Sequence, residues 1–241
     1  MNIIKVMDYA EMSDYACDFL MNKMENLQKP VLGLATGSTP EGLYHRLIEK
    51  KVSFRNVVTF NLDEYVGLDR KNPNSYYYYM NDKLFNHVDI EMDKVHVPNG
   101  SATNLEKECH DYEEAIREAG QIDVQVLGIG VNGHIGFNEP GTAFTSRTHI
   151  VELDVSTRQA NSRFFDSMEE VPTKAITMGI DSIMDSKEIL LLISGHSKAH
   201  AVARLLEGEI NEDFPASVLR RHKNVTIVVD EAAMSEVKEN K

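Results

Sequence analysis

Short apolar runs alternate with longer amphipathic stretches along most of the chain. The apolar runs are strand-sized and bounded by turn residues, and they cover residues 31–35, 57–60, 124–129, 189–193 and 225–229. The stretches between them place apolar residues at helical spacing, over residues 9–27, 41–49, 75–85, 105–118 and 197–206. This alternation predicts an α/β fold: a mostly parallel, open Rossmann-like sheet with helices on both faces.

Length and composition narrow the class of protein. A chain of 241 residues with no linker-like segment or internal repeat predicts a single domain over residues 1–241. Two distant cysteines, Cys17 and Cys109, provide neither a disulfide framework nor a thiolate metal site, and they fit a reducing compartment. Acidic Asp8 comes too early for a secretory signal, and no apolar run approaches the roughly 20 residues of a membrane span. We therefore expect a cytoplasmic protein without a membrane partner.

The charge balance limits the partners further. The chain has 38 acidic and 25 basic residues, a formal charge of −13, which argues against nucleic acid or an anionic membrane as a partner. A small anionic substrate remains possible, because a few basic groups inside a cleft set the local potential within a screening length of about 8 to 10 Å.

A first polar cluster, residues 36–40, lies between a predicted strand and a predicted helix. Pro40 suits the first helical position, and Ser38 or Thr39 could cap the helix. Free backbone amides of Gly37, Ser38 and Thr39, together with the helix dipole, would form an anion site suited to a phosphate. Taken alone, the cluster is better explained as an ordinary capped helix start.

A second cluster, residues 61–65, follows the strand predicted at 57–60. The adjacent acids Asp63 and Glu64 could be surface residues. Ligands of open parallel sheets sit beyond the carboxyl ends of the strands, however, and Asp63 lies on that side. A carboxylate there could shuttle a proton between neighbouring carbon atoms.

The third cluster is the glycine-rich segment 128–141, which comes directly after the apolar residues 124–127. Residues 128–133 match the dinucleotide pattern G-x-G-x-x-G, with Glu152 near the distance of a ribose-binding acid. We do not favour that interpretation, because further glycines and Pro140 oppose the helix that the pattern requires. His134 and Glu139 instead suggest an imidazole held by a carboxylate for general acid or base chemistry.

Two cationic residues downstream are further candidates, Arg163 and Lys198. Lys198 is the stronger candidate, because it opens a helix after the strand predicted at 189–193 and so faces the same sheet edge. The tyrosines at 76–79 are expected to pack a helix rather than to bind a ligand.

Taken together, the motifs resemble the glucosamine-6-phosphate deaminase (isomerase) family in order over essentially the whole chain. The matching segments are residues 32–40, 60–68, 133–140, 160–165 and 197–198. The resemblance implies conversion of glucosamine 6-phosphate and water to fructose 6-phosphate and ammonia in amino-sugar catabolism, with no metal or organic cofactor.

The family's residue roles transfer to matching positions. By resemblance, His134 would move the proton that opens the pyranose ring, with Glu139 and Asn132 orienting it, and Asp63 would carry the C2 proton to C1. The phosphate would be bound by Gly37, Ser38, Thr39, Arg163 and Lys198. The chemistry fits these roles, because ring opening and enolisation need two separate proton-transfer groups.

The chain departs from some family members. Asn132 stands where some members carry Asp, and His149 and Val151 stand where allosteric members carry basic residues. The extended carboxyl terminus of larger members is also missing. We therefore expect a monomer or low-order homo-oligomer without allosteric activation, and a lid at about residues 154–182, including Arg163.

Two other functions remain as alternatives. A 6-phosphogluconolactonase would share the fold and a Gly-His loop but needs no base such as Asp63. A sugar-phosphate-sensing effector domain would need no His134 and Glu139 pair, and the acidic chain offers no basic recognition helix.

Overall fold

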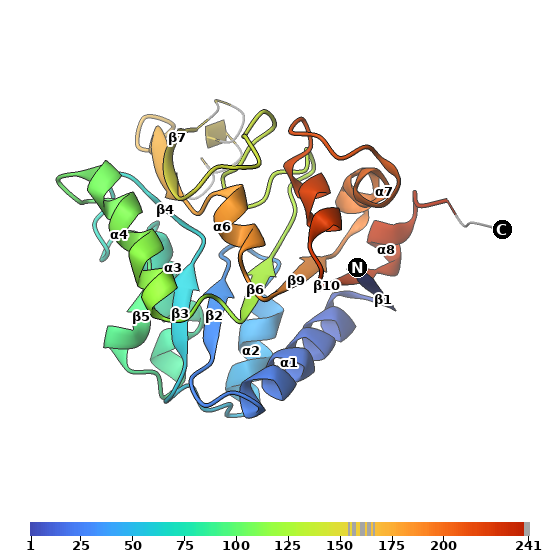
Figure 1. Ribbon diagram of the computed structural model, residues 1–241, viewed down its shortest axis with the longest axis horizontal. Coiled ribbons are helices and arrows are strands. Elements are labelled where there is room, and N and C mark those ends of the chain that lie inside the picture. The colour runs from blue at the N-terminus through green and yellow to red at the C-terminus, as the bar shows by residue number, and fades with distance from the viewer. Residues whose placement is uncertain (154, 156–157, 160–161, 163–164, 166, 239–241) are drawn as a thin grey trace.

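A seven-stranded parallel sheet forms the centre of the molecule (Figure 1). The computed structural model describes residues 1–153, 155, 158–159, 162, 165 and 167–238. Within this part of the chain every strand pair of the central sheet is parallel. The strands, in spatial order, are β1 (Asn2–Val6), β10 (Val225–Asp230), β9 (Glu188–Ile193), β6 (Val124–Leu127), β2 (Val31–Leu34), β3 (Val58–Asn61) and β5 (Val95–His96).

Helices cover both faces of this sheet, because strand side chains alternate between two apolar layers. One layer packs Leu20, Leu43 and Met80 against strand residues such as Leu32 and Val126. These side chains come from α1 (Tyr9–Glu25), α2 (Glu41–Glu49) and α3 (Tyr76–Lys83).

The opposite layer packs Ile116, Ile183, Val202 and Ala233 against strand residues such as Leu191. These side chains come from α4 (Leu105–Glu118), α6 (Ile180–Met184), α7 (Ala199–Glu207) and α8 (Glu231–Met234). The chain also forms short 3₁₀ turns, η1 (Phe85–His87), η2 (Met92–Lys94), η4 (His196–Lys198) and η5 (Pro215–Arg221). The predicted α/β fold is confirmed.

The strand order reverses beside β2. After β2 the chain adds β3 and β5 on one side, and it then returns to place β6 and β9 on the other side. In open parallel sheets such a reversal leaves a crevice beyond the carboxyl ends of the two strands, where ligands bind. The segments that follow β2 and β6 are the first and third polar clusters.

A second, three-stranded antiparallel sheet was not predicted. It consists of β4 (Asp63–Tyr65), β8 (Lys174–Thr177) and β7 (His149–Glu152), with β8 in the middle. Figure 1 shows β4 and β7 above the carboxyl end of β3. Strands of three or four residues are too short for a clear alternation of apolar and polar positions. This small sheet fixes Asp63 beside the crevice.

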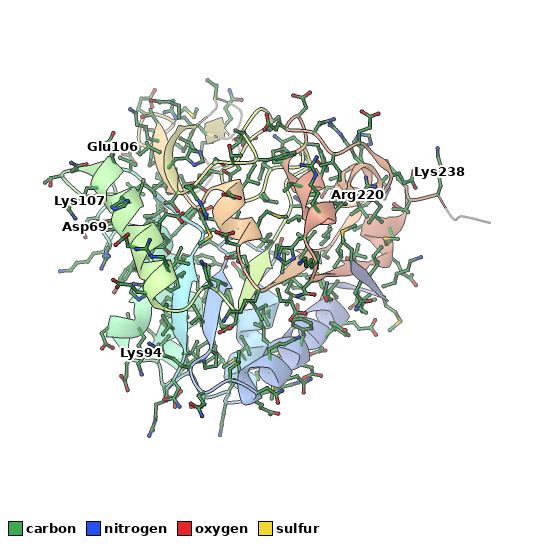
Figure 2. All side chains as sticks on the ribbon, viewed as in Figure 1. Asp69, Lys94, Glu106, Lys107, Arg220 and Lys238 are labelled. Atoms are coloured by element: carbon green, nitrogen blue, oxygen red, sulfur yellow. The ribbon has the colours of Figure 1, made fainter. Side chains whose placement is uncertain are left out.

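Charged side chains project outward around the molecule, among them Lys94, Lys107 and Lys238 (Figure 2). In the part of the chain described, no helix has the length and apolar character needed to cross a membrane.

Candidate active site

A cleft of about 420 Å³ opens beyond the carboxyl ends of β2, β3 and β6. All three polar clusters contribute to its wall. The lining includes Thr36, Gly37 and Thr39 of the first cluster, Asp63 of the second, and Asn132, His134 and Glu139 of the third. The structure therefore brings together side chains and backbone that lie up to about a hundred residues apart in the sequence.

The first cluster forms a tight turn between β2 and α2. Gly37 adopts a φ of 91°, a left-handed conformation that favours glycine. The predicted helix start needs correction, because Pro40 occupies the cap position itself and no side chain caps α2. The hydroxyl of Tyr9 accepts from Gly42 N at 2.7 Å instead, so an orphan amide of the first helical turn is satisfied from another helix.

Asp63 lies in the wall of the cleft at the start of β4, and only 6% of its surface is exposed. Burial, aided by the charge of neighbouring Glu64, raises the pKa of Asp63 to about 8. A carboxyl group with a pKa near neutral can both take up and release a proton during turnover. Asp63 therefore has the environment of a proton-transfer group rather than of a surface acid.

Glu64, the next residue, is buried and serves a different purpose. Its carboxylate accepts backbone N–H bonds from Tyr76 and Tyr77, both at 2.9 Å, at the start of α3. It also accepts from Tyr65 N at 2.8 Å. A carboxylate at a helix amino terminus satisfies unpaired N–H groups and favours the helix dipole. Glu64 thus fixes α3 against β4, which places Tyr76 in the wall of the cleft.

The loop at residues 128–141 has an irregular path with no helix, as predicted, and this excludes a dinucleotide-binding turn. The ring of His134 lies against Gly130, where an added Cβ atom would come within 2.2 Å of the ring. Gly136 has a φ of 59°, and an added Cβ there would meet Thr177 Oγ1 at 2.9 Å. Buried Asn138 anchors the loop by donating to the carbonyl of Met178 at 2.9 Å.

A hydrogen-bonded chain links His134 to Glu139 through Asn132. Asn132 Nδ2 donates to Glu139 Oε2 at 2.6 Å, which leaves Asn132 Oδ1 as an acceptor. His134 Nδ1 lies 2.8 Å from that oxygen, so Nδ1 carries the proton of the neutral ring. Nε2 is then left with its lone pair and can accept a proton, as a general base must.

The carboxylate also affects the imidazole electrostatically, since Glu139 Oε1 lies 3.7 Å from His134 Nδ1. Burial lowers the pKa of His134, and the positive charge of Lys198 lowers it further, while Glu139 opposes both effects. The neutral, proton-accepting ring is consequently favoured at neutral pH.

The remaining predicted residues lie in different settings. Lys198 follows β9 in η4, and its Nζ donates to the carbonyl of Ile129 at 2.7 Å, at the start of the His134 loop. Burial lowers the pKa of Lys198. Ser38 is exposed between two cleft-lining residues, and Arg163 lies outside the described residues.

Tyr76 is a cleft residue that the sequence analysis missed, because a run of tyrosines at helical spacing is usually a packing surface. It stacks on Phe137 of the His134 loop with 6.1 Å between ring centroids. The only signal in the sequence was that the tyrosine run follows the Asp63 cluster closely along the chain. Among the described residues, no group of three or more His, Cys, Asp or Glu side chains is arranged to hold a metal ion.

Comparison with known proteins agrees with this geometry. Residues 7–228 match the family model of glucosamine-6-phosphate isomerases and 6-phosphogluconolactonases. Glucosamine-6-phosphate deaminase of Oceanobacillus iheyensis is 58% identical, over 98% of this chain and 96% of its own length. Glucosamine-6-phosphate deaminase 1 of Bacillus subtilis is 52% identical, over 98% and 99% respectively.

Solved structures give the same result at the level of the fold. A monomeric glucosamine-6-phosphate deaminase is 52% identical and superposes with a TM-score of 0.95, covering 98% of this chain and 100% of that one. A 6-phosphogluconolactonase from Thermotoga maritima has a TM-score of 0.77 at 24% identity, covering 95% and 99%, and shares the fold alone.

Proposed function

The chain belongs to the family of glucosamine-6-phosphate isomerases and 6-phosphogluconolactonases, and on this premise we propose that it is a glucosamine-6-phosphate deaminase. The observation that carries the proposal is the presence, in one cleft, of two separate proton-transfer groups: Asp63, and His134 with its Asn132–Glu139 chain. An aldose–ketose conversion that begins from a closed ring needs both groups. Relatives at 52–58% identity named glucosamine-6-phosphate deaminase support this choice within the family.

Ring opening is the first step. His134 Nε2 accepts the proton of the anomeric hydroxyl, and the imidazolium then returns this proton to the ring oxygen as its bond to C1 breaks. Asn132 holds the proton on Nδ1, and the charge of Glu139 stabilises the imidazolium that forms. The product is the open-chain amino aldehyde, whose C2 proton is acidified by the neighbouring carbonyl group.

Asp63 then transfers a proton between two carbon atoms. Its carboxylate removes the C2 proton to give an enolamine, and the same carboxyl group delivers a proton to C1. Water hydrolyses the resulting C2 imine to the ketone and ammonia, so the atoms balance without another reactant. Because Asp63 must be ionised to act as a base and has a pKa of about 8, kcat/KM should rise as the pH increases through that region.

The phosphate is proposed to lie at the turn of Gly37, Ser38 and Thr39, where backbone amides precede α2. Lys198 adds a cation beside the loop of His134, and Arg163 is a further candidate. A lid remains part of the proposal. Part of the segment predicted at about residues 154–182 lies outside the described residues, and residues 175–178 within it are buried in and beside β8.

We further propose a cytoplasmic enzyme that acts as a monomer, like its 52% identical structural neighbour. Cys17 and Cys109 are free and buried, which suits a reducing compartment. His149 and Val151 lie in β7 and provide no pair of cations for an allosteric phosphate. Hyperbolic kinetics, unchanged by N-acetylglucosamine 6-phosphate, are expected; sigmoidal kinetics relieved by that compound would contradict this part of the proposal.

The direct test is an incubation with glucosamine 6-phosphate in the presence of EDTA, following ammonia and fructose 6-phosphate in one assay. We expect the two products in equal amounts. A parallel incubation with 6-phosphogluconolactone tests the hydrolase alternative. Turnover of the lactone alone would overturn the proposal, and turnover of neither compound would favour a sugar-phosphate sensor.

A further inference from the structure

Three tyrosine hydroxyls, one from each helix on one face of the sheet, bind the backbone of the turn at residues 36–40 or of Ala35 directly before it. Each donates a hydrogen bond to a carbonyl oxygen: Tyr44 to Ala35 at 2.6 Å, Tyr79 to Gly37 at 2.7 Å and Tyr9 to Ser38 at 2.8 Å. The turn is thus held at two successive carbonyl groups, those of Gly37 and Ser38, and the chain is also held at Ala35 directly before it.

Peptide geometry gives these bonds a consequence. All described peptide bonds are trans, so the N–H of each following residue points away from the bonded carbonyl. The bonds from Tyr79 and Tyr9 therefore turn the N–H groups of Ser38 and Thr39 away from the tyrosines. Among the hydrogen bonds of the described residues, no backbone N–H of residues 36–39 is a donor. Those N–H groups remain available to an external acceptor.

We propose that Tyr79 and Tyr9 are positioning residues that hold the amides of this turn ready for the phosphate group of the substrate. The inference rests on the proposed function, which supplies the phosphate. Amides already oriented before binding do not lose conformational freedom when the anion arrives, and the affinity is higher for that reason. Tyr9 extends the arrangement to α2, because its hydroxyl also accepts from Gly42 N.

Tyr79→Phe is the sharpest variant, because it removes one oxygen atom from a residue outside the reacting groups. We expect the Kd for inorganic phosphate and the KM for glucosamine 6-phosphate each to rise about three- to tenfold, the range for the loss of one hydrogen bond. The kcat should stay within about twofold. Tyr78→Phe is the matched control, since Tyr78 is the neighbouring tyrosine, is 43% exposed, and makes no hydrogen bond through its hydroxyl among the described residues.

Tyr9→Phe provides a second, independent variant at the other end of the turn. It should weaken phosphate binding in the same direction and lower the melting temperature slightly, because Gly42 N also loses its acceptor. Phosphate binding is measured by isothermal calorimetry on the whole chain and needs no turnover.

The outcomes separate this inference from the proposed function. An unchanged phosphate Kd in both variants would overturn it, and so would a fall in kcat at constant KM or a fall in melting temperature alone. A wild type that shows no saturable phosphate binding would also overturn it. A wild type that binds phosphate but does not deaminate would overturn the proposed function alone, and the phosphate Kd values would still decide the role of Tyr79.

Discussion

The two loops that flank the cleft are held in opposite ways. In the loop at residues 128–141, the groups that orient His134 are Asn132 and Glu139, all within eight residues of one another. The turn at residues 36–40 is held by hydroxyls from two helices, α1 and α3, and Tyr79 lies 42 residues from its acceptor. The first loop therefore contains the residues that orient its own reactive group, whereas the conformation of the second is stabilised by side chains from distant helices. We therefore assign proton transfer to the first and phosphate affinity to the second.

The largest effect should come from a substitution in the loop at residues 128–141 that disturbs the orientation of His134. Asn132→Leu keeps the side-chain size but removes the acceptor that holds the proton on His134 Nδ1. We expect kcat to fall roughly 100- to 1000-fold, with KM changed less than about threefold. Asn22→Leu, the same substitution at an exposed asparagine of α1, is the control. Equal changes in kcat and KM would break the division of roles between the two loops.

A smaller effect, on phosphate binding rather than on turnover, is expected at Lys198. Lys198→Met removes the charge but preserves most of the side-chain volume. KM and the phosphate Kd should rise roughly 10- to 100-fold, the range for losing a charge-assisted hydrogen bond, while kcat changes little. Lys223→Met, at an exposed lysine, provides the comparison. A kcat defect with normal phosphate affinity would place Lys198 with the proton-transfer groups instead.

The smallest effect is an electrostatic one within the His134 loop. Glu139→Gln removes a negative charge that raises the pKa of His134, so this pKa should fall further. The neutral ring would then persist to a lower pH than in the wild type. NMR titration of the imidazole resonances measures the change, with exposed His110 as an internal reference. A rise in the pKa of His134 would show that Glu139 does not act through its charge.

Local patterns explain what the sequence could predict. The buried parallel strands and amphipathic helices were foreseeable, because each shows its own periodicity, and the loop at 128–141 was foreseeable because its reactive groups are neighbours in the chain. The antiparallel sheet that carries Asp63 could not be predicted in this way, because β4 has three residues and pairs with β8, more than a hundred residues later. The tyrosine bonds to the 36–40 turn and the contribution of Tyr76 to the cleft also depend on tertiary packing, which leaves no periodic signal.

The central claim is that Asp63 moves the proton between C2 and C1, and Asp63→Asn tests it most directly. The variant preserves the shape of the side chain and leaves the turn at residues 36–40 intact. We predict that turnover of glucosamine 6-phosphate falls by roughly two to four orders of magnitude while the Kd for inorganic phosphate stays within about twofold. Near-normal turnover in this variant would contradict the account.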